Sequence, residues 1–427
     1  MIIDLKGKKL LMMGGVQATC EVIKEAKRLG IYVLETDYLK DSPAKKLADK
    51  SFMVSTTDSD AVAKLAVSEQ VDGIFTCYTD LLLPYCQETC ALLNKPFWGN
   101  DRNIRMCIDK KLFKTACAQS GVPVVPWLLV TPQNVKQSLN ELQFPLVIKP
   151  ADNSGSRGVF KCFQKPDYLK MCEKAFQFSK NKELMVERLM DVNKEFSVYY
   201  FIHKGISHLT SMGDRYVDVV NVNSAPQAKG MLLPSVHLYE WMDKMDEKIK
   251  KFFRDNEMNE GYVFIQGFYD NGDFYLSEIG YRLNGGDTYK LVEQCSRVNI
   301  VELLLSYSLT GDVDEAKIEL FNPFFEQKAF LVTVGLRNGK IGAINGIEKI
   351  LRHKNIRGVS QMHFVGDELD SPGTNAQVFA YFMCIGEDAP SLKEAVSYVR
   401  TNLEVLDENG KDMLVGVIDP EIIMFQK

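Results

Sequence analysis

The sequence predicts an α/β fold at the N-terminus and an α+β fold in the rest of the 427-residue chain. Two observations support this prediction. Up to about residue 106, short apolar segments alternate with helical patterns, which is typical of a parallel sheet with crossover helices. Beyond that point, β-rich segments follow one another around turns, which favours an α+β arrangement over a second doubly wound sheet. We therefore expect three domains: a Rossmann-like domain in residues 1–106, a central domain in 107–320 and a small α+β domain in 321–427.

The N-terminal domain is expected to begin with a buried strand that leads into a glycine turn. The turn reads Gly14-Gly15-Val16-Gln17-Ala18-Thr19. A dinucleotide fingerprint needs Gly-x-Gly-x-x-Gly at this point, and its last two glycines are missing, although Asp37 follows at a suitable distance. The turn is therefore interpreted as structural, with a Rossmann oxidoreductase as the alternative. The expected elements are strands at 9–13, 31–35 and 73–76, a helix that ends at Leu29, and a helix at 61–71.

The central and C-terminal regions carry the remaining expected elements. A helix is expected from Asp109 to Ser120, because Gly121 stops its pattern. The Asn-Gly pair at 271–272 between two β runs is the strongest short hairpin signal, and it predicts a hairpin over 262–280. Further strands are expected at 128–130, 146–149, 159–163, 196–202, 329–334, 378–384 and 413–418.

Composition narrows the class of protein. A net charge of −5 argues against a nucleic-acid binder, which normally has a basic surplus. The chain starts without a signal-peptide pattern, and no apolar run reaches the ~18 residues of a membrane span, so we expect a cytoplasmic protein with no membrane partner. Its ten cysteines are scattered, which favours reduced and mostly buried thiols. For Cys86 and Cys90, four residues apart, core packing is favoured over metal binding.

Two lysines and a loop are candidates for binding an anion. Lys110 begins a helix, and Lys149 ends an apolar strand, where an ammonium group without a partner is costly. A phosphate would satisfy that charge. The Gly/Ser-rich loop after Lys149 would let backbone N–H groups approach an anion closely. The alternatives are a lysine that reaches solvent and an ordinary flexible turn. The candidate loop residues are Ser154, Gly155, Ser156, Arg157 and Gly158.

Two further segments fit a nucleotide site. In the first, a strand emerges at Glu187, the backbone after it could pair with an adenine edge, and Glu195 is placed to accept a sugar hydroxyl. In the second, Glu278, Arg282 and Asn284 have even spacing and would share one face if extended. Their carboxylate, guanidinium and amide suit Mg²⁺ and a triphosphate, because Mg²⁺ prefers oxygen ligands and arginine forks around phosphate. The alternative is a surface strand with an ordinary Glu–Arg pair.

The register of the hairpin tests whether two of its side chains can share a cation. A regular two-residue turn pairs Gln266 with Ser277 and places Glu278 on the opposite face. A loop of odd length, or one bulge, would instead place Gln266 opposite Glu278, with Cβ atoms about 4.5–5.5 Å apart. Shared metal binding requires the second register.

The order of these motifs, over most of residues 8–310, resembles the ATP-grasp superfamily, which includes biotin carboxylase, carbamoyl-phosphate synthetase, D-alanine–D-alanine ligase and the L-amino-acid ligases. The resemblance implies a pre-ATP-grasp domain, a central ATP-grasp domain with a mobile lid at about 118–187, and a C-terminal domain. The implied roles are phosphate binding by Lys110 and Lys149, a mobile flap at 154–158, adenine contacts by Glu187 and Leu189, ribose binding by Glu195, metal binding by Glu278, and stabilisation of the transferred phosphoryl group by Arg282.

The sequence departs from the family's pattern at two positions of the implied metal site. The family usually has an acid where Gln266 stands, although a glutamine there also resembles carbamoyl-phosphate synthetase. The family's Glu-x-Asn reads Glu278-Ile279-Gly280, so an amide ligand is missing, and Asn284 is the candidate to replace it. Upstream, Asp214-Arg215 and the stretch Lys229–Ser235 lie in a region that faces the second substrate or the phosphates in the family. For any single residue there, a surface connection is the alternative.

The resemblance implies ATP and Mg²⁺, with Mn²⁺ as an alternative cation. A small carboxylate, for example an amino acid, would attack the γ-phosphorus, and an amine would capture the acyl phosphate to give an amide, ADP and phosphate. The C-terminal region resembles that of L-amino-acid ligases, which favours a carboxylate–amine ligase. The alternatives are an enzyme that activates bicarbonate and a non-catalytic nucleotide-binding relative. A homodimer is the expected assembly if the chain is not a monomer.

Overall fold

The computed structural model describes residues 3–151, 158–218, 227–370 and 375–425. Its N-terminal sheet is parallel, in the order β3-β2-β1-β4, as the alternation of strands and helices predicts. Leu10 and Met12 of β1 face one hydrophobic cluster while Leu11 and Met13 face another, so the strand is buried on both sides. The elements are β1 (Lys9–Met13), α1 (Thr19–Arg28), β2 (Tyr32–Thr36), β3 (Lys50–Phe52), α2 (Ser59–Ser68), β4 (Gly73–Thr76) and α3 (Leu83–Leu92).

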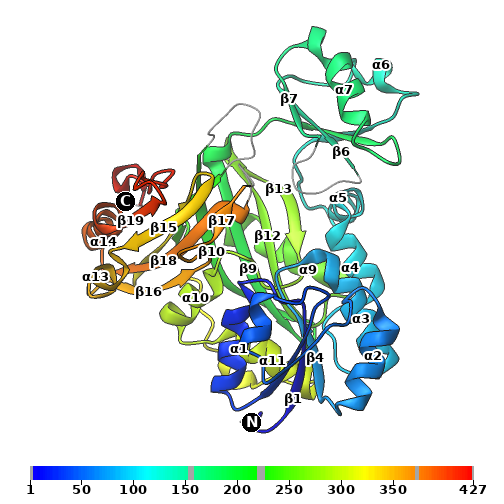
Figure 1. The fold of residues 1–427 in the computed structure, drawn as a ribbon. Helices are drawn as coiled ribbons and strands as arrows, with labels where there is room; N and C mark the ends of the chain where they lie inside the picture. Colours follow the sequence, from blue (N-terminus) through cyan, green and yellow to red (C-terminus); the bar gives the residue numbers. More distant parts are fainter. Residues whose placement is uncertain (1–2, 152–157, 219–226, 371–374, 426–427) are drawn as a thin grey trace.

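A second, four-stranded antiparallel sheet occupies the range expected for the lid. Its strand order is β5-β8-β6-β7, and α7 packs against it around the buried Tyr168. In Figure 1 this unit projects at the top, joined to the remainder through α4 and α5. The elements are α4 (Asp101–Ile108), α5 (Lys110–Gln119), β5 (Trp127–Val130), α6 (Val135–Ser138), β6 (Leu146–Pro150), β7 (Phe160–Cys162), α7 (Tyr168–Phe176) and β8 (Leu184–Arg188).

The largest sheet has eight antiparallel strands in the order β13-β12-β9-β10-β11-β14-β18-β16. It runs through the middle of Figure 1 and takes strands from both sides of the expected boundary near residue 320, so the central and C-terminal regions share one sheet. Its strands are β9 (Glu195–His203), β10 (Ile206–Asp218), β11 (Gln227–Leu233), β12 (Gly261–Asp270), β13 (Asp273–Gly280), β14 (Lys328–Gly335), β16 (Ile356–Gln361) and β18 (Val378–Gly386).

Helices and a small sheet cover this central sheet. A three-stranded sheet in the order β17-β15-β19 lies in the C-terminal region, where α14 packs against β14 and β18. The remaining elements are α8 (Leu238–Lys244), α9 (Asp246–Asp255), α10 (Thr288–Ser296), α11 (Ile300–Thr310), α12 (Glu315–Ile318), β15 (Gly339–Asn345), α13 (Ile347–Leu351), β17 (Glu368–Leu369), α14 (Ala389–Asn402) and β19 (Glu404–Asp407).

The strand expected at 413–418 is wrong. Only isolated bridges form there, between Leu336 and Leu414 and between Leu406 and Asp412. Gly416 has φ +96°, which takes the backbone out of the extended region and ends the pairing. The segment is nevertheless held beside β14, because Val415 N–H donates to the Gly335 carbonyl at 3.0 Å.

The N-terminal domain is fixed against the large sheet by close backbone contacts. A Cβ on Gly73 of β4 would lie 2.2 Å from the Ser308 carbonyl oxygen of α11, so only glycine allows this approach. Trp98 Nε1 donates to the Tyr281 carbonyl at 2.9 Å, and Tyr281 Oη donates back to the Trp98 carbonyl at 2.8 Å. This reciprocal pair fixes the chain at the residue directly before Arg282.

Candidate functional site

A buried cluster of two lysines and a glutamate joins α5 to the lid sheet. Lys149 Nζ lies 2.5 Å from Glu187 Oε2, and Lys114 Nζ lies 2.8 Å from Glu187 Oε1. Lys114 is fully buried and also donates to the Val125 carbonyl at 2.9 Å. Burial alone would raise the pKa of Glu187, but the ammonium groups of Lys149 and Lys114 outweigh it and lower the pKa to about 2. The carboxylate is therefore ionised at neutral pH.

Lys114 is a residue that sequence reasoning missed. It lies one helical turn after Lys110, and both are on α5, which Asp109 caps by accepting from the backbone N–H groups of Lys111 and Leu112. Lys110 is half-buried in the first turn and is not among the lysines paired with Glu187. The available signal was the position of Lys114 beside Phe113 on the buried face of the helix. The predicted role of Lys110 in phosphate binding stays a prediction.

Four of the candidate loop residues, Ser154, Gly155, Ser156 and Arg157, lie outside the described residues. Gly158 is described, and its φ is +78°. A Cβ at this position would lie 2.7 Å from Cβ of Phe178, so glycine is required for both its backbone conformation and its space.

The hinge between the lid and the large sheet is held by charge. Arg188 Nη2 lies 3.1 Å from Asp270 Oδ2, and Lys194 Nζ lies 2.7 Å from Asp270 Oδ1. The Arg188 guanidinium also lies over the Tyr275 ring, 4.8 Å from its centroid. Leu189, expected beside adenine, is half-buried, and its N–H donates to the Pro145 carbonyl at 2.9 Å. The hairpin tip thus anchors the chain that leaves the lid.

The hairpin register places two candidate metal ligands side by side. Gln266 of β12 is paired directly with Glu278 of β13, because the register shifts after Gln266. The turn itself has the expected two residues, with φ +53° at Asn271 and +88° at Gly272. A bulge therefore provides the register that shared metal binding requires, and metal binding by these residues stays a prediction.

Strand alternation brings two more charged groups to the same face of the large sheet. Gln266 pairs with Ser197 of β9, and Ser197 pairs with Gly213 of β10, so Glu195 and Arg215, two residues away, lie on that face as well. Arg215 Nη1 lies 3.0 Å from Glu195 Oε2. Burial raises the pKa of Glu195, the Arg215 guanidinium opposes this, and the Glu278 carboxylate adds to it.

The Gln266 amide connects these groups. In the orientation that satisfies both neighbours, its NH₂ donates to Glu278 Oε1 at 2.5 Å and its carbonyl accepts from Arg215 Nη1 at 3.0 Å. The face thus presents a continuous chain from Glu195 through Arg215 and Gln266 to Glu278. Carboxylate and amide oxygens beside a guanidinium suit a cation and a phosphate.

Arg282 and Asn284 do not continue the strand, because β13 ends at Gly280. Arg282 instead pairs with Asp80 of the N-terminal domain, with Nε 2.6 Å from Oδ1 and Nη2 2.5 Å from Oδ2. Asp80 is a second residue that sequence reasoning missed, since nothing in the sequence connects it to Arg282. Asn284 Nδ2 donates to Thr288 Oγ1 at 3.1 Å, while its buried Oδ1 accepts no hydrogen bond within the described part of the chain.

The donor set fits a magnesium ion that shares its coordination with a nucleotide. Within the described ranges, no three His, Cys, Asp or Glu side chains gather in a way that could hold a metal. Mg²⁺ usually keeps several waters and takes one or two carboxylates together with substrate phosphates. Glu278 meets that smaller requirement, and the roles of Gln266 and Asn284 as further metal ligands stay predictions.

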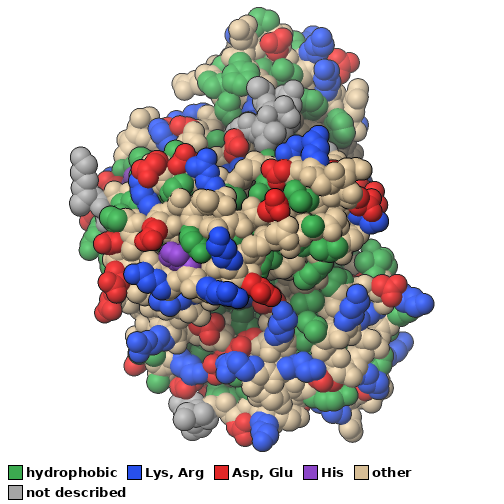
Figure 2. All heavy atoms as spheres, turned by 60° about the vertical axis from the view of Figure 1, so that its left-hand side comes forward, with side chains coloured by type: hydrophobic (Ala, Val, Ile, Leu, Met, Phe, Trp, Pro, Cys, Tyr) green, Lys and Arg blue, Asp and Glu red, His purple; other side chains and the backbone are tan. Residues whose placement is uncertain are grey.

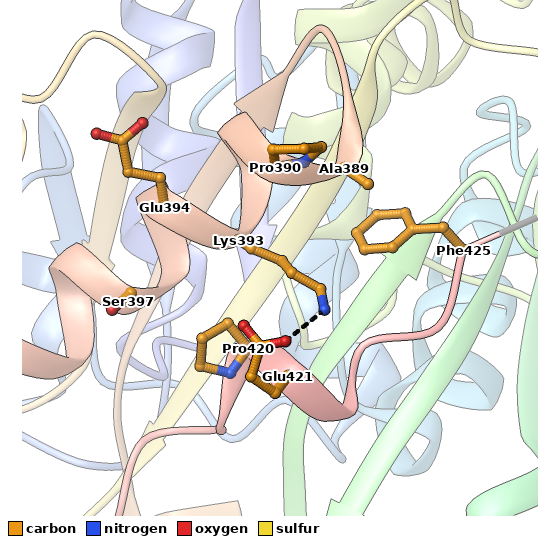
Figure 3. Close-up of a pocket in the computed structure, with 8 residues that line it drawn as sticks. All are labelled: Ala389, Pro390, Lys393, Glu394, Ser397, Pro420, Glu421 and Phe425. Carbon is orange, nitrogen blue, oxygen red and sulfur yellow. Dashed lines mark hydrogen bonds and ion pairs between the residues drawn. The ribbon is translucent and has the colours of Figure 1, made fainter.

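A separate surface hollow of about 530 Å³ lies in the C-terminal region. Figure 3 shows it between α14 and the segment that ends at Phe425, with Lys393 and Glu421 joined by an ion pair of 3.0 Å. None of the candidate site residues lines it. On the face drawn in Figure 2, basic and acidic side chains are interspersed.

Comparison with known proteins relates this arrangement to one superfamily. A family model described as D-ala D-ala ligase C-terminus matches residues 116–204. The chain is 25% identical over 210 residues to a formate-dependent phosphoribosylglycinamide formyltransferase of Sulfurisphaera tokodaii. The aligned residues cover 47% of this chain and 52% of that protein. In this and two further formyltransferases the chain spans about half of the relative's length: 52%, 55% and 49%.

Solved structures match over nearly the whole chain. The L-amino acid ligase from Bacillus licheniformis has a TM-score of 0.77 at 17% identity, covering 95% of this chain and 100% of that one. The biotin carboxylase domain dimer of the Hydrogenobacter thermophilus 2-oxoglutarate carboxylase has a TM-score of 0.76 at 18% identity, covering 96% and 91%. That structure is a complex with magnesium ADP, ADP and bicarbonate.

The fold of this chain is that of the ATP-grasp superfamily, to which its sequence motifs and these comparisons relate it. It has the mixed architecture of that superfamily over its full length, with a parallel N-terminal sheet followed by antiparallel sheets. Among the described residues, every helix is too short or too polar to cross a membrane.

Proposed function

We propose that this protein is a carboxylate–amine ligase that depends on Mg-ATP and forms an amide through an acyl phosphate. The observation that supports this most is the shared face of Glu195, Arg215, Gln266 and Glu278, where a bulge aligns the candidate metal ligands beside a guanidinium. The proposal includes the activity of the whole protein, a small carboxylate and an amine as its substrates, and a homodimer as its assembly.

In this proposal the lid and the large sheet hold the nucleotide from opposite sides. Lys149, together with Lys110 and the loop 154–158, would bind phosphate oxygens, while Glu187 and Leu189 would lie beside adenine and Glu195 beside ribose. Glu278 would hold the cation. Magnesium, when bound, neutralises charge on the phosphates and orients them.

The chemistry needs positioning more than a protein nucleophile. A carboxylate oxygen of the acid attacks the γ-phosphorus, the bond to the β-phosphate oxygen breaks, and ADP leaves. The amine then attacks the acyl carbon, loses a proton and expels phosphate. Arg282, already fixed by Asp80, would stabilise the charge of the transferred phosphoryl group.

The names of the relatives support an acid as the activated substrate. Formate is named in the formyltransferases and amino acids in the ligase, and both are carboxylic acids. A second candidate function is bicarbonate activation, which is supported by the biotin carboxylase domain with bound bicarbonate and by the glutamine at position 266. The departures at Gln266 and Gly280 support a third candidate, a relative that binds nucleotide without turnover.

Release of ADP separates these candidates. The purified protein would be supplied with Mg-ATP and pooled amino acids, other small carboxylates or bicarbonate, each with and without amines. ADP that forms only with an acid and an amine supports the ligase. ADP that forms with bicarbonate alone supports the second function, and nucleotide binding without any ADP supports the third.

A further inference from the structure

The candidate metal site differs from the expected pattern at two positions, Gln266 and Gly280. In the structure, other groups occupy the place of the expected metal ligand at both positions. At the first, the Gln266 amide is already occupied as a bridge, donating to Glu278 Oε1 at 2.5 Å and accepting from Arg215 Nη1 at 3.0 Å. A glutamate at position 266 would offer a negatively charged oxygen ligand to a cation. The glutamine is neutral, and its two hydrogen bonds instead join the Arg215 guanidinium to the Glu278 carboxylate.

At the second position, no side chain fits. Gly280 is paired with Phe264 across the hairpin, and a Cβ on Gly280 would lie 2.2 Å from Cε1 and Cζ of the Phe264 ring. The ring therefore takes the space of the missing amide ligand. The Arg282 guanidinium lies over the same ring, 5.2 Å from its centroid.

Arg215 is linked to the remaining carboxylate, Glu278, through the Gln266 amide. Its side chain is 21% exposed and pairs with Glu195, whose side chain is 17% exposed, at 3.0 Å. Guanidinium is always charged and its donors match phosphate oxygens. A second divalent cation beside it would meet like charge. Of the two carboxylates on this face, Glu195 is already paired with Arg215, which leaves Glu278 for a cation.

We propose that, within the Mg-ATP function above on which this inference rests, the chain holds its nucleotide with a single divalent cation at Glu278, and that Arg215 supplies the positive charge of a second one. Gln266 then acts as a bridge that aligns Arg215 and Glu278, not as a metal ligand. The nucleotide phosphates and water complete the coordination of the single cation.

The test counts Mn²⁺ by electron paramagnetic resonance in the full chain with saturating AMP-PNP, a nucleotide that is not hydrolysed. The wild type is expected to bind one Mn²⁺ per chain. Two Mn²⁺ per chain would overturn the single-cation inference and leave the proposed function standing. A wild type that binds no AMP-PNP would overturn both.

Calorimetry of AMP-PNP binding tests the role of Arg215. With one equivalent of metal, Arg215→Gln is expected to lose at least tenfold in affinity and to recover part of it in excess Mg²⁺, because an ion can then replace the lost charge. Arg215→Lys keeps the charge and is expected to behave like the wild type in its metal dependence, which separates charge from folding. Arg352→Gln, on an exposed arginine after α13, is the matched control. Unchanged affinity and metal dependence in Arg215→Gln would overturn the assignment.

Discussion

Gln266 and Glu278 lie directly opposite each other on β12 and β13, and the amide of the first donates to the carboxylate of the second. A regular hairpin with the same Asn-Gly turn would have placed them on opposite faces. The register shift after Gln266 thus places Glu278 on the same face as Gln266. Arg215 of β10 joins this pair through the Gln266 carbonyl, and Glu195 of β9 is paired in turn with Arg215.

Loss of Lys149 is expected to weaken nucleotide binding. Lys149→Ala removes charge-assisted contacts worth about 1.5–3 kcal/mol, so the dissociation constant for Mg-ATP should rise roughly 10- to 150-fold. Isothermal calorimetry measures this directly. Lys170→Ala, on an exposed lysine of α7, is the control and should leave affinity unchanged. Equal affinity in both variants would contradict the phosphate role of Lys149.

Glu187 is expected to stabilise the fold above acidic pH. Its folded pKa of about 2 lies below the ordinary value of 4.5, so the unfolded state binds more protons between these values. The contribution is therefore complete above about pH 4.5 and is lost as pH falls toward 2. Glu187→Gln leaves the buried ammonium of Lys114 and the half-buried ammonium of Lys149 without their carboxylate, which should cost about 3–5 kcal/mol at neutral pH. Urea unfolding at pH 7 and pH 3 would show a smaller difference between the variant and the wild type at the lower pH. An equal difference at both would contradict the low pKa.

Glu35 is expected to act in the opposite direction. It is fully buried beside Ser42, and burial raises its pKa to about 7, with Lys45 opposing and Asp37 reinforcing the shift. The folded state then binds more protons between about pH 4.5 and 7, so stability falls as pH rises through this window. Glu35→Gln should flatten that fall and raise the melting temperature at pH 8 relative to the wild type. The idea fails if the melting temperatures of the two proteins stay parallel from pH 5 to pH 8.

The contact between Gly280 and Phe264 predicts a steric effect. Gly280→Ala forces a methyl group into the aromatic ring and should destabilise the fold by about 1–3 kcal/mol. Gly285→Ala is the matched control, because no atom lies within 4 Å of a Cβ there. In a Phe264→Ala background the ring is gone, so the same alanine at 280 should cost little. Chemical denaturation of the four variants checks this, and additive costs would contradict the account.

Local patterns predicted most of the architecture, because strand alternation, glycine turns and the Asn-Gly hairpin act over a few residues. The sequence allows two registers for the hairpin, and the structure selects the one that pairs Gln266 with Glu278. Long-range contacts were not predictable in this way. The buried Lys114 is paired with Glu187, which lies 73 residues later in the chain. Asp80 is paired with Arg282 across a separation of 202 residues. No periodicity in a single sequence records such pairs.

The most direct test of the central claim follows oxygen from the acid into phosphate. Amino acids labelled with ¹⁸O in both carboxylate oxygens would be supplied with Mg-ATP and an amine in unlabelled water, and the released phosphate analysed by mass spectrometry. An acyl phosphate transfers one carboxylate oxygen, so the account predicts one ¹⁸O in each phosphate that accompanies an amide. Amide formation with phosphate that carries no ¹⁸O, or no turnover with any acid and amine, would contradict it.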